Sequence, residues 1–187
     1  ALPISLDFGL SSIYYTLHPG SFQPRGDKSL VVPDVVTKEQ ALESAAYLTE
    51  KYNITSSLSV QAGIRFSLYN YMGPKTIYQY ADGLPKETGN ITDTLQYNKG
   101  KFINKYFGPE YRLSLRYAIT DNFSVKAGYN SLRQYIHMLS NTTAIAPTDI
   151  WKLSDPNIKP QYGDQFSIGF YKNFKSNTIE TSVETYY

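Results

Sequence analysis

Apolar and polar side chains alternate one by one along several stretches of this chain. In residues 107–119 the odd positions carry Phe, Pro, Tyr, Leu, Leu, Tyr and Ile, whereas the even positions carry Gly, Glu, Arg, Ser, Arg and Ala. Because successive side chains of a β-strand point to opposite faces, this pattern predicts a long strand with one apolar and one polar face.

The same alternation recurs in other segments, and together they predict an all-β chain of about seven antiparallel strands. The expected strands are about 3–17, 43–53, 57–71, 105–119, 123–138, 164–175 and 178–187. The segment 43–53 is the weakest, because its Ala and Glu content also fits a short helix. In the strand 123–138 the alternation becomes irregular from Leu132 to Met138.

Short and long connections alternate between these strands. Turns rich in Asn, Asp, Ser and Thr occupy 53–56, 120–122 and 176–177, as hairpins favour. The long connections are about 18–42, 72–104 and 139–163, and they hold most of the Pro and Gly residues. Consecutive antiparallel strands place every second connection at the same end of a sheet. The pattern therefore predicts short periplasmic turns at one rim and long extracellular loops at the other, as in a transmembrane β-barrel.

The composition of the chain bears on its partners and on whether it crosses a membrane. With 18 Lys and Arg against 16 Asp and Glu in 187 residues, the chain is nearly neutral, so nothing recommends nucleic acid as a partner. There are no cysteines and 18 tyrosines, and tyrosine suits surfaces that are half apolar and half wet. No apolar run approaches the roughly 20 residues of a transmembrane helix. The strands of a membrane barrel contain no such run, because lipid-facing and lumen-facing residues alternate. A soluble β-rich sheet with one wet face stays an alternative, and the length of the strands favours the membrane.

Three stretches carry a resemblance to a known family: AGIRFSLYNYMGP, YFGPEYRLSLRYAITDNFSVKAGYN and LRQYIHMLSNTTAIAPTDIWKLSDPNIKPQYGDQFSIGFYKNF. From about Ala41 onward, the chain resembles the barrel region of TonB-dependent outer-membrane receptors of the Bacteroidota type. One departure is Tyr111, where the family often has Pro between Glu and Arg. The resemblance implies that residues 1–187 form the middle part of a barrel of about 22 strands, with the plug domain outside them.

The resemblance also implies a function and a set of partners. It implies uptake of a nutrient of the siderophore, glycan, peptide or vitamin class at the bacterial outer membrane. The partners would be outer-membrane lipid, the rest of the barrel and its plug, and the TonB complex, reached through the N-terminal part of the receptor. Two alternatives stay open: a receptor-like scaffold for surface lipoproteins or an envelope machine, and a soluble β-rich binding module.

Candidate chemistry is sparse. The motifs GxSxG, GxGxxG and HExxH do not occur, so no enzyme activity, cofactor or metal site is expected. The two histidines, His18 and His137, are interpreted as loop or rim residues. On the inner polar face, four charged residues are candidates for contact with an anionic ligand or the plug, or for pairing within the wall. These are Arg65, Glu110, Arg112 and Arg116.

Aromatic residues form the second set of candidates. Those expected on extracellular loops, where they could stack on a sugar, grip a partner or pack the loops together, are Tyr71, Tyr78, Tyr80 and Trp151. Others near strand ends are expected to form girdles at the bilayer interfaces. These are Tyr69, Tyr71, Tyr106, Phe107 and Tyr117.

Overall fold

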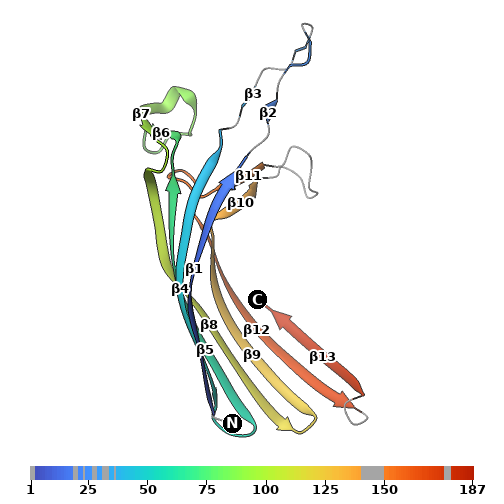
Figure 1. The fold of residues 1–187 in the computed structure, drawn as a ribbon. Coiled ribbons are helices and arrows are strands. Elements are labelled where there is room, and N and C mark those ends of the chain that lie inside the picture. Colours follow the sequence, from blue (N-terminus) through green and yellow to red (C-terminus); the bar gives the residue numbers. More distant parts are fainter. Residues whose placement is uncertain are drawn as a thin grey trace.

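The computed structural model describes residues 3–18, 21–22, 24–26, 29–30, 34–35, 37–139, 150–174 and 178–187. Its main element is a seven-stranded antiparallel sheet with the order β1-β4-β5-β8-β9-β12-β13 (Figure 1). The strands are β1 (Ile4–Leu17), β4 (Glu39–Asn53), β5 (Leu58–Met72), β8 (Phe102–Thr120), β9 (Phe123–Gln134), β12 (Gln161–Phe174) and β13 (Ile179–Tyr186). The prediction of seven antiparallel strands in an all-β chain is confirmed.

Each long connection carries a small two-stranded sheet of its own. β2 (Ser21–Phe22) pairs with β3 (Asp34–Val35), and β6 (Lys75–Tyr80) pairs with β7 (Ile91–Tyr97). β10 (Ile136–Leu139) pairs with β11 (Ile150–Leu153). A single 3₁₀ turn, η1 (Thr88–Asn90), lies between β6 and β7. These additions gather at one end of the main sheet, and the short turns lie at the other end (Figure 1).

Several strands reach further toward the loop end than the alternation predicts. β8 begins at Phe102 and β12 at Gln161, each three residues before the predicted start. β4 begins at Glu39, and the short helix considered for this segment is wrong. Its residues pair with β1 and β5 along the whole strand, from Glu39↔Leu17 to Asn53↔Ser59. Two ladders of backbone hydrogen bonds outweigh the modest helix preference of Ala and Glu.

β9 ends earlier than predicted. Its register with β12 runs to Gln134, Tyr135 interrupts the strand, and β10 turns away to pair with β11. This departure falls within the stretch where the alternation becomes irregular.

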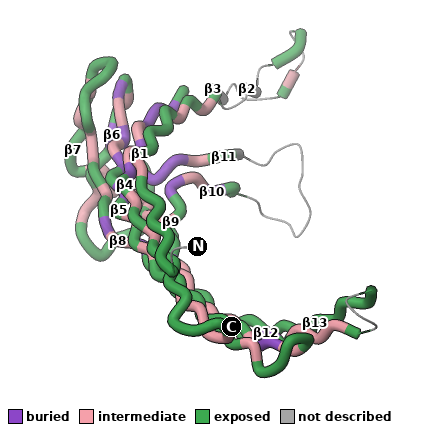
Figure 2. The backbone as a smooth tube through the Cα atoms, turned by 60° about the horizontal axis from the view of Figure 1, so that its bottom comes forward, coloured by how far each residue is buried: buried purple, intermediate pink, exposed green. Residues whose placement is uncertain are grey.

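The main sheet bends into an arc, and the β10–β11 hairpin lies on the inner side of that arc (Figure 2). The outer face is apolar and exposed along most of its length. Its exposed residues include Leu6, Phe8, Leu10, Leu48, Ile64, Phe66, Phe107, Leu113, Leu115, Tyr117, Phe166, Ile168 and Phe170. The two faces of residues 107–119 are therefore separated as the alternation predicts.

A small core lies at the loop end, on the inner side of the sheet. It consists of Ala41, Tyr69, Tyr71, Ile77, Tyr135 and Leu153. These residues come from the main sheet, the two hairpins β6–β7 and β10–β11, and Tyr135, which joins β9 to β10, so the core joins both hairpins to the wall. Within the described residues, no helix is long and apolar enough to cross a membrane.

Candidate functional site: the inner wall and the loop end

Arg65 forms an ion triplet with two glutamates on the inner face. Arg65 Nη2 lies 2.6 Å from Glu43 Oε1, and Arg65 Nη1 lies 2.6 Å from Glu110 Oε1. The hydroxyl of Tyr15 donates to Glu43 Oε2 at 2.8 Å. The antiparallel register makes this cluster possible, because Arg65 stands directly opposite Glu110. The cluster ties together β1, β4, β5 and β8.

The triplet gives Arg65, Glu43 and Glu110 partners of opposite charge within the wall. Both carboxylates are almost fully buried, with side-chain exposures of 8% for Glu43 and 6% for Glu110. Buried charges need partners of opposite sign, and here each carboxylate has the same guanidinium. Arg65 and Glu110 are therefore ion-paired with each other within the wall, and contact of either residue with a ligand or the plug stays a prediction.

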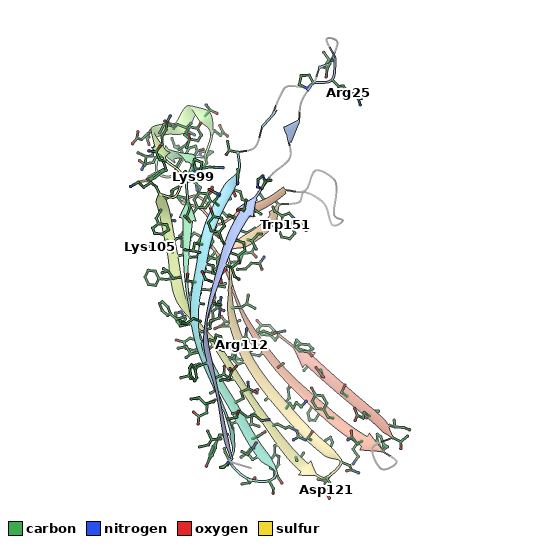
Figure 3. The ribbon with its side chains drawn as sticks, in the orientation of Figure 1. Arg25, Lys99, Lys105, Arg112, Asp121 and Trp151 are labelled. Atoms are coloured by element: carbon green, nitrogen blue, oxygen red, sulfur yellow. The ribbon has the colours of Figure 1, made fainter. Side chains whose placement is uncertain are left out.

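Arg112 and Arg116 lie on the same face but are not paired in this way. Within the described residues neither makes a salt bridge, and both are exposed. Arg112 lies roughly midway along the sheet (Figure 3) and borders a depression of about 410 Å³ in the inner wall. Arg116 stands directly opposite Lys126 of β9, so two cations face each other there. Like charges placed directly opposite are unfavourable. Lys126 Nζ lies over the ring of Tyr171, 4.0 Å from its centroid.

A second ionic cluster, which the sequence did not indicate, is centred on Glu39. Its side chain is 1% exposed, and its carboxylate pairs with Lys75 at 3.2 Å and with Lys152. Leu153 donates its backbone N–H to Glu39 Oε2 at 3.0 Å, and Lys152 also pairs with Asp155 at 3.0 Å. Two acids and two lysines balance in charge. We call this group of Glu39, Lys75, Lys152 and Asp155 the loop latch.

Electrostatics keeps Lys152 of the loop latch protonated. Burial by itself would lower the pKa of Lys152, but the hydrogen bond and charge of Glu39, aided by Asp155, raise it above its usual value. The ammonium group therefore stays protonated. The only sequence signal for Glu39 was its position on the same face as Ala41 and Glu43, in a segment interpreted as a loop.

Tyrosines near the loop end point inward, so the prediction that Tyr69, Tyr71 and Tyr106 form an interfacial girdle is wrong. Tyr69 and Tyr71 are 0% exposed and share the face of Arg65. Tyr69 stacks on Tyr135 with ring centroids 4.6 Å apart and donates to the backbone oxygen of Ser154 at 2.8 Å. Tyr106 donates to the backbone oxygen of Asp155 at 2.7 Å. The β10–β11 hairpin and the residues after it cover these rings. The sequence pattern does not indicate this contact, because it forms only when the loop folds onto the wall.

The four loop aromatics have different environments. Tyr71 is not on a loop: it lies in β5, buried, and its hydroxyl donates to Glu39 at 3.2 Å. Tyr78 is exposed and Tyr80 half-buried on β6, and both line one cavity. Trp151 lies on the β10–β11 hairpin (Figure 3), 51% exposed, opposite Met138. Phe107 and Tyr117, by contrast, lie exposed on the outer face.

His137 belongs to β10 of the β10–β11 hairpin at the loop end, and its side chain is buried. Its Nε2 lies 2.9 Å from Ser154 Oγ, and its Nδ1 is buried without a hydrogen-bond partner among the residues that the structure describes. Burial lowers the pKa of His137 below its usual value, so the neutral ring is favoured. Across the described residues, no group of three or more His, Cys, Asp or Glu side chains could hold a metal ion.

A sequence model described as "TonB dependent receptor-like, beta-barrel" matches residues 2–187. The chain belongs to this family. TonB-dependent receptors are outer-membrane receptors and transporters rather than enzymes, and they work together with a plug and with TonB. The match covers almost the whole chain and includes every strand of the main sheet. No curated protein and no solved structure matches the chain.

Proposed function

We propose that this chain forms part of the wall and the extracellular loops of an outer-membrane receptor of the Bacteroidota type, which takes up a nutrient with energy from TonB. The observation that carries the proposal is the separation of the two faces of the sheet. The outer face presents exposed apolar side chains, and the inner face presents charged residues and tyrosine hydroxyls. A lipid-facing band around a polar interior is the arrangement of a transmembrane barrel.

Strand length supports the same proposal. β5 has 15 residues and β8 has 19, whereas crossing a bilayer as a tilted strand takes roughly 9–11. The sheet as described has two free edges, β1 and β13. Unpaired backbone groups are costly in lipid, so we propose that both edges pair with further strands of a barrel of about 22.

We further propose that Arg112 and Arg116 contact acidic side chains of a plug inside the barrel. Both are exposed cations on the inner wall, and neither has a salt bridge within the described part of the chain. Arg65 and Glu110 have a structural role, because their ion pair holds neighbouring strands together.

The proposed function is tested in the intact receptor by extraction and by energy dependence. We expect the receptor in the outer-membrane fraction, released by detergent and not by high salt or alkaline carbonate. Deletion of TonB should abolish accumulation of its nutrient. Release without detergent would support the soluble binding module instead. Accumulation or surface assembly that is unchanged without TonB would support the scaffold.

A further inference from the structure

The apolar band on the outer face ends at a defined level near the loop end. On β5 its outer residues run from Leu58 to Leu68. A strand rises about 3.3 Å per residue, so at the tilt of about 40° found in membrane barrels this stretch is about 25 Å tall. That is also the height of the lipid-facing band of such barrels. The next outer positions toward the loops, Asn70 and Lys105, therefore lie at the level of lipid headgroups.

Positive charge gathers at and above this level, on the β8 side of the sheet. Lys105 stands directly opposite Asn70. Among the described outer-face residues in the loop half of β4, β5 and β8, Lys105 alone is charged. Lys99 and Lys101 follow in the tight turn before β8, where Gly73 donates its backbone N–H to the backbone oxygen of Lys101 at 2.9 Å. Lys99 and Lys105 lie on the same side of the loop end (Figure 3).

These three lysines are available to an anionic partner. Lys99, Lys101 and Lys105 are exposed, and none of them makes a salt bridge to another residue that the structure describes. Basic residues beside a bilayer attract anionic headgroups. Cations directly above an apolar band therefore match a ligand that carries both negative charge and hydrocarbon.

An apolar groove lies in the band on the turn side of this level. It has a volume of about 530 Å³ and spans β1, β4 and β5. Leu68, at its upper end, is the outer-face neighbour of Asn70 on β5. The two serine hydroxyls in it lie 3.5 Å apart and bond to each other, so the groove offers mainly hydrocarbon to a ligand. Its outer-face lining consists of Leu10, Ser12, Ser44, Ala46, Phe66 and Leu68.

We infer that this surface binds a phosphorylated glycolipid of the outer leaflet, with Lys99, Lys101 and Lys105 on its phosphate groups and an acyl chain in the groove. The inference rests on the proposed function, because the band faces lipid only in a membrane barrel whose loops are extracellular. The outer leaflet of a bacterial outer membrane is built from glycolipids with phosphate groups and several acyl chains. Charge favours such a lipid over phosphatidylethanolamine, whose phosphate is balanced by its own ammonium group.

Retention of defined lipids by the intact receptor in detergent, measured by native mass spectrometry, tests the inference. The probes are bisphosphorylated lipid A, the same lipid without its phosphates, and phosphatidylethanolamine. The unaltered receptor should bind the phosphorylated lipid A most tightly. A lysine beside an anionic headgroup contributes about fivefold in affinity, so K105Q should weaken this binding about fivefold and K101Q/K105Q about 25-fold. Neither change should alter binding of the lipid without phosphates.

The position of the acyl chain is tested separately by A46L. Ala46 is exposed on the outer face, and leucine there keeps the face apolar while filling the groove. Both forms of lipid A should bind several-fold more weakly, and the preference for the phosphorylated form should stay. Unchanged binding of both forms would overturn the assignment of the groove.

The matched control is K172Q. Lys172 is an outer-face lysine at the opposite rim, where its Nζ donates to Asn122 Oδ1 at 2.8 Å, so its replacement should keep the preference for phosphate. Loss of the preference in K172Q would overturn the inference. Equal binding of the two forms of lipid A by the unaltered receptor, or an unchanged preference in K101Q/K105Q, would also overturn it.

Failure of this inference is distinct from failure of the proposed function. A receptor that needs detergent for extraction and TonB for uptake, but shows no preference for phosphate, refutes the inference alone. Release of the receptor without detergent refutes the proposed function, and the inference falls with it.

Discussion

Leu153 donates its backbone N–H to the carboxylate of Glu39 at 3.0 Å, across a separation of 114 positions in the chain. The same carboxylate holds Lys75 and Lys152, so residues from all three predicted long connections meet at one buried group. The loops of this receptor are thus tied to the wall by a charge-balanced latch. We infer that the latch keeps the β10–β11 hairpin inside the arc of the sheet.

Replacing Glu39 by Gln should release the hairpin. Lys75 and Lys152 would then lose their common counter-charge in a buried position, and removing one partner of a buried pair costs about 3–5 kcal/mol. We expect faster hydrogen exchange at the Leu153 amide and new proteolytic cleavage in the hairpin. The control is E87Q, an exposed acid of the β6–β7 connection. Equal protection of Leu153 in E39Q would show that the latch does not hold the hairpin.

Replacing Arg65 by Met should destabilise the wall itself. Glu43 and Glu110 would be left as two buried acids without a cation, at a cost of about 3 kcal/mol or more. The temperature at which the folded barrel loses its altered mobility in SDS gels should fall. Adding E43Q and E110Q to R65M should restore part of the loss, because the buried charge is then removed. K51Q alters an exposed lysine of β4 that has no salt bridge within the described residues, and it should leave the transition in place.

A new charge at two adjacent positions on β8 should affect folding at one position and not at the other. Leu113 is 49% exposed on the outer face, and Ser114 points to the inner face. An arginine facing lipid near the bilayer midplane costs about 2–4 kcal/mol, whereas one facing a wet interior costs little. We expect L113R to reduce the amount of folded receptor in the outer membrane and S114R to be tolerated. Comparable folding of both variants would contradict the assignment of the faces.

Acid should loosen the β10–β11 hairpin through His137. The pKa of His137 is lowered by burial, so the contribution of His137 to stability is present above its unfolded pKa of about 6.5 and is lost as the pH falls below that value. Lys152 stands directly opposite and would repel a second cation. Exchange of the Leu153 amide should therefore accelerate between pH 7.5 and 5.5, beyond its intrinsic dependence on pH. H137Q should flatten this response, and an unchanged profile in that variant would assign it to other groups.

The sequence predicted only part of the cluster of Arg65, Glu43 and Glu110. Alternation places Arg65 and Glu110 on one face, but it does not say which residue of a neighbouring strand stands opposite. A shift of one residue in register would move Arg65 to the other side of the sheet. Sequence reasoning therefore could not assign Arg65 and Glu110 to one ion pair, and only the register shows that they stand opposite each other.

The buried tyrosines show a different limit. Tyr69 and Tyr71 lie near the end of a strand. An aromatic residue on the outer face there would form part of a girdle, whereas one on the inner face packs against the loop that covers it. The cover is the β10–β11 hairpin, whose backbone at Ser154 follows Tyr69 by 85 positions. Nothing in the local pattern of either segment indicates that contact.

The sequence by itself determined the seven strands, their antiparallel arrangement and the separation of apolar from polar faces, because these follow from a period of two along each strand. Only the tertiary structure decided which charges are paired and which are free, why Glu39 and His137 are buried, and where a cavity forms. Those properties depend on contacts between residues far apart in the chain. Such contacts are set by strand register and by the folding of loops onto the wall.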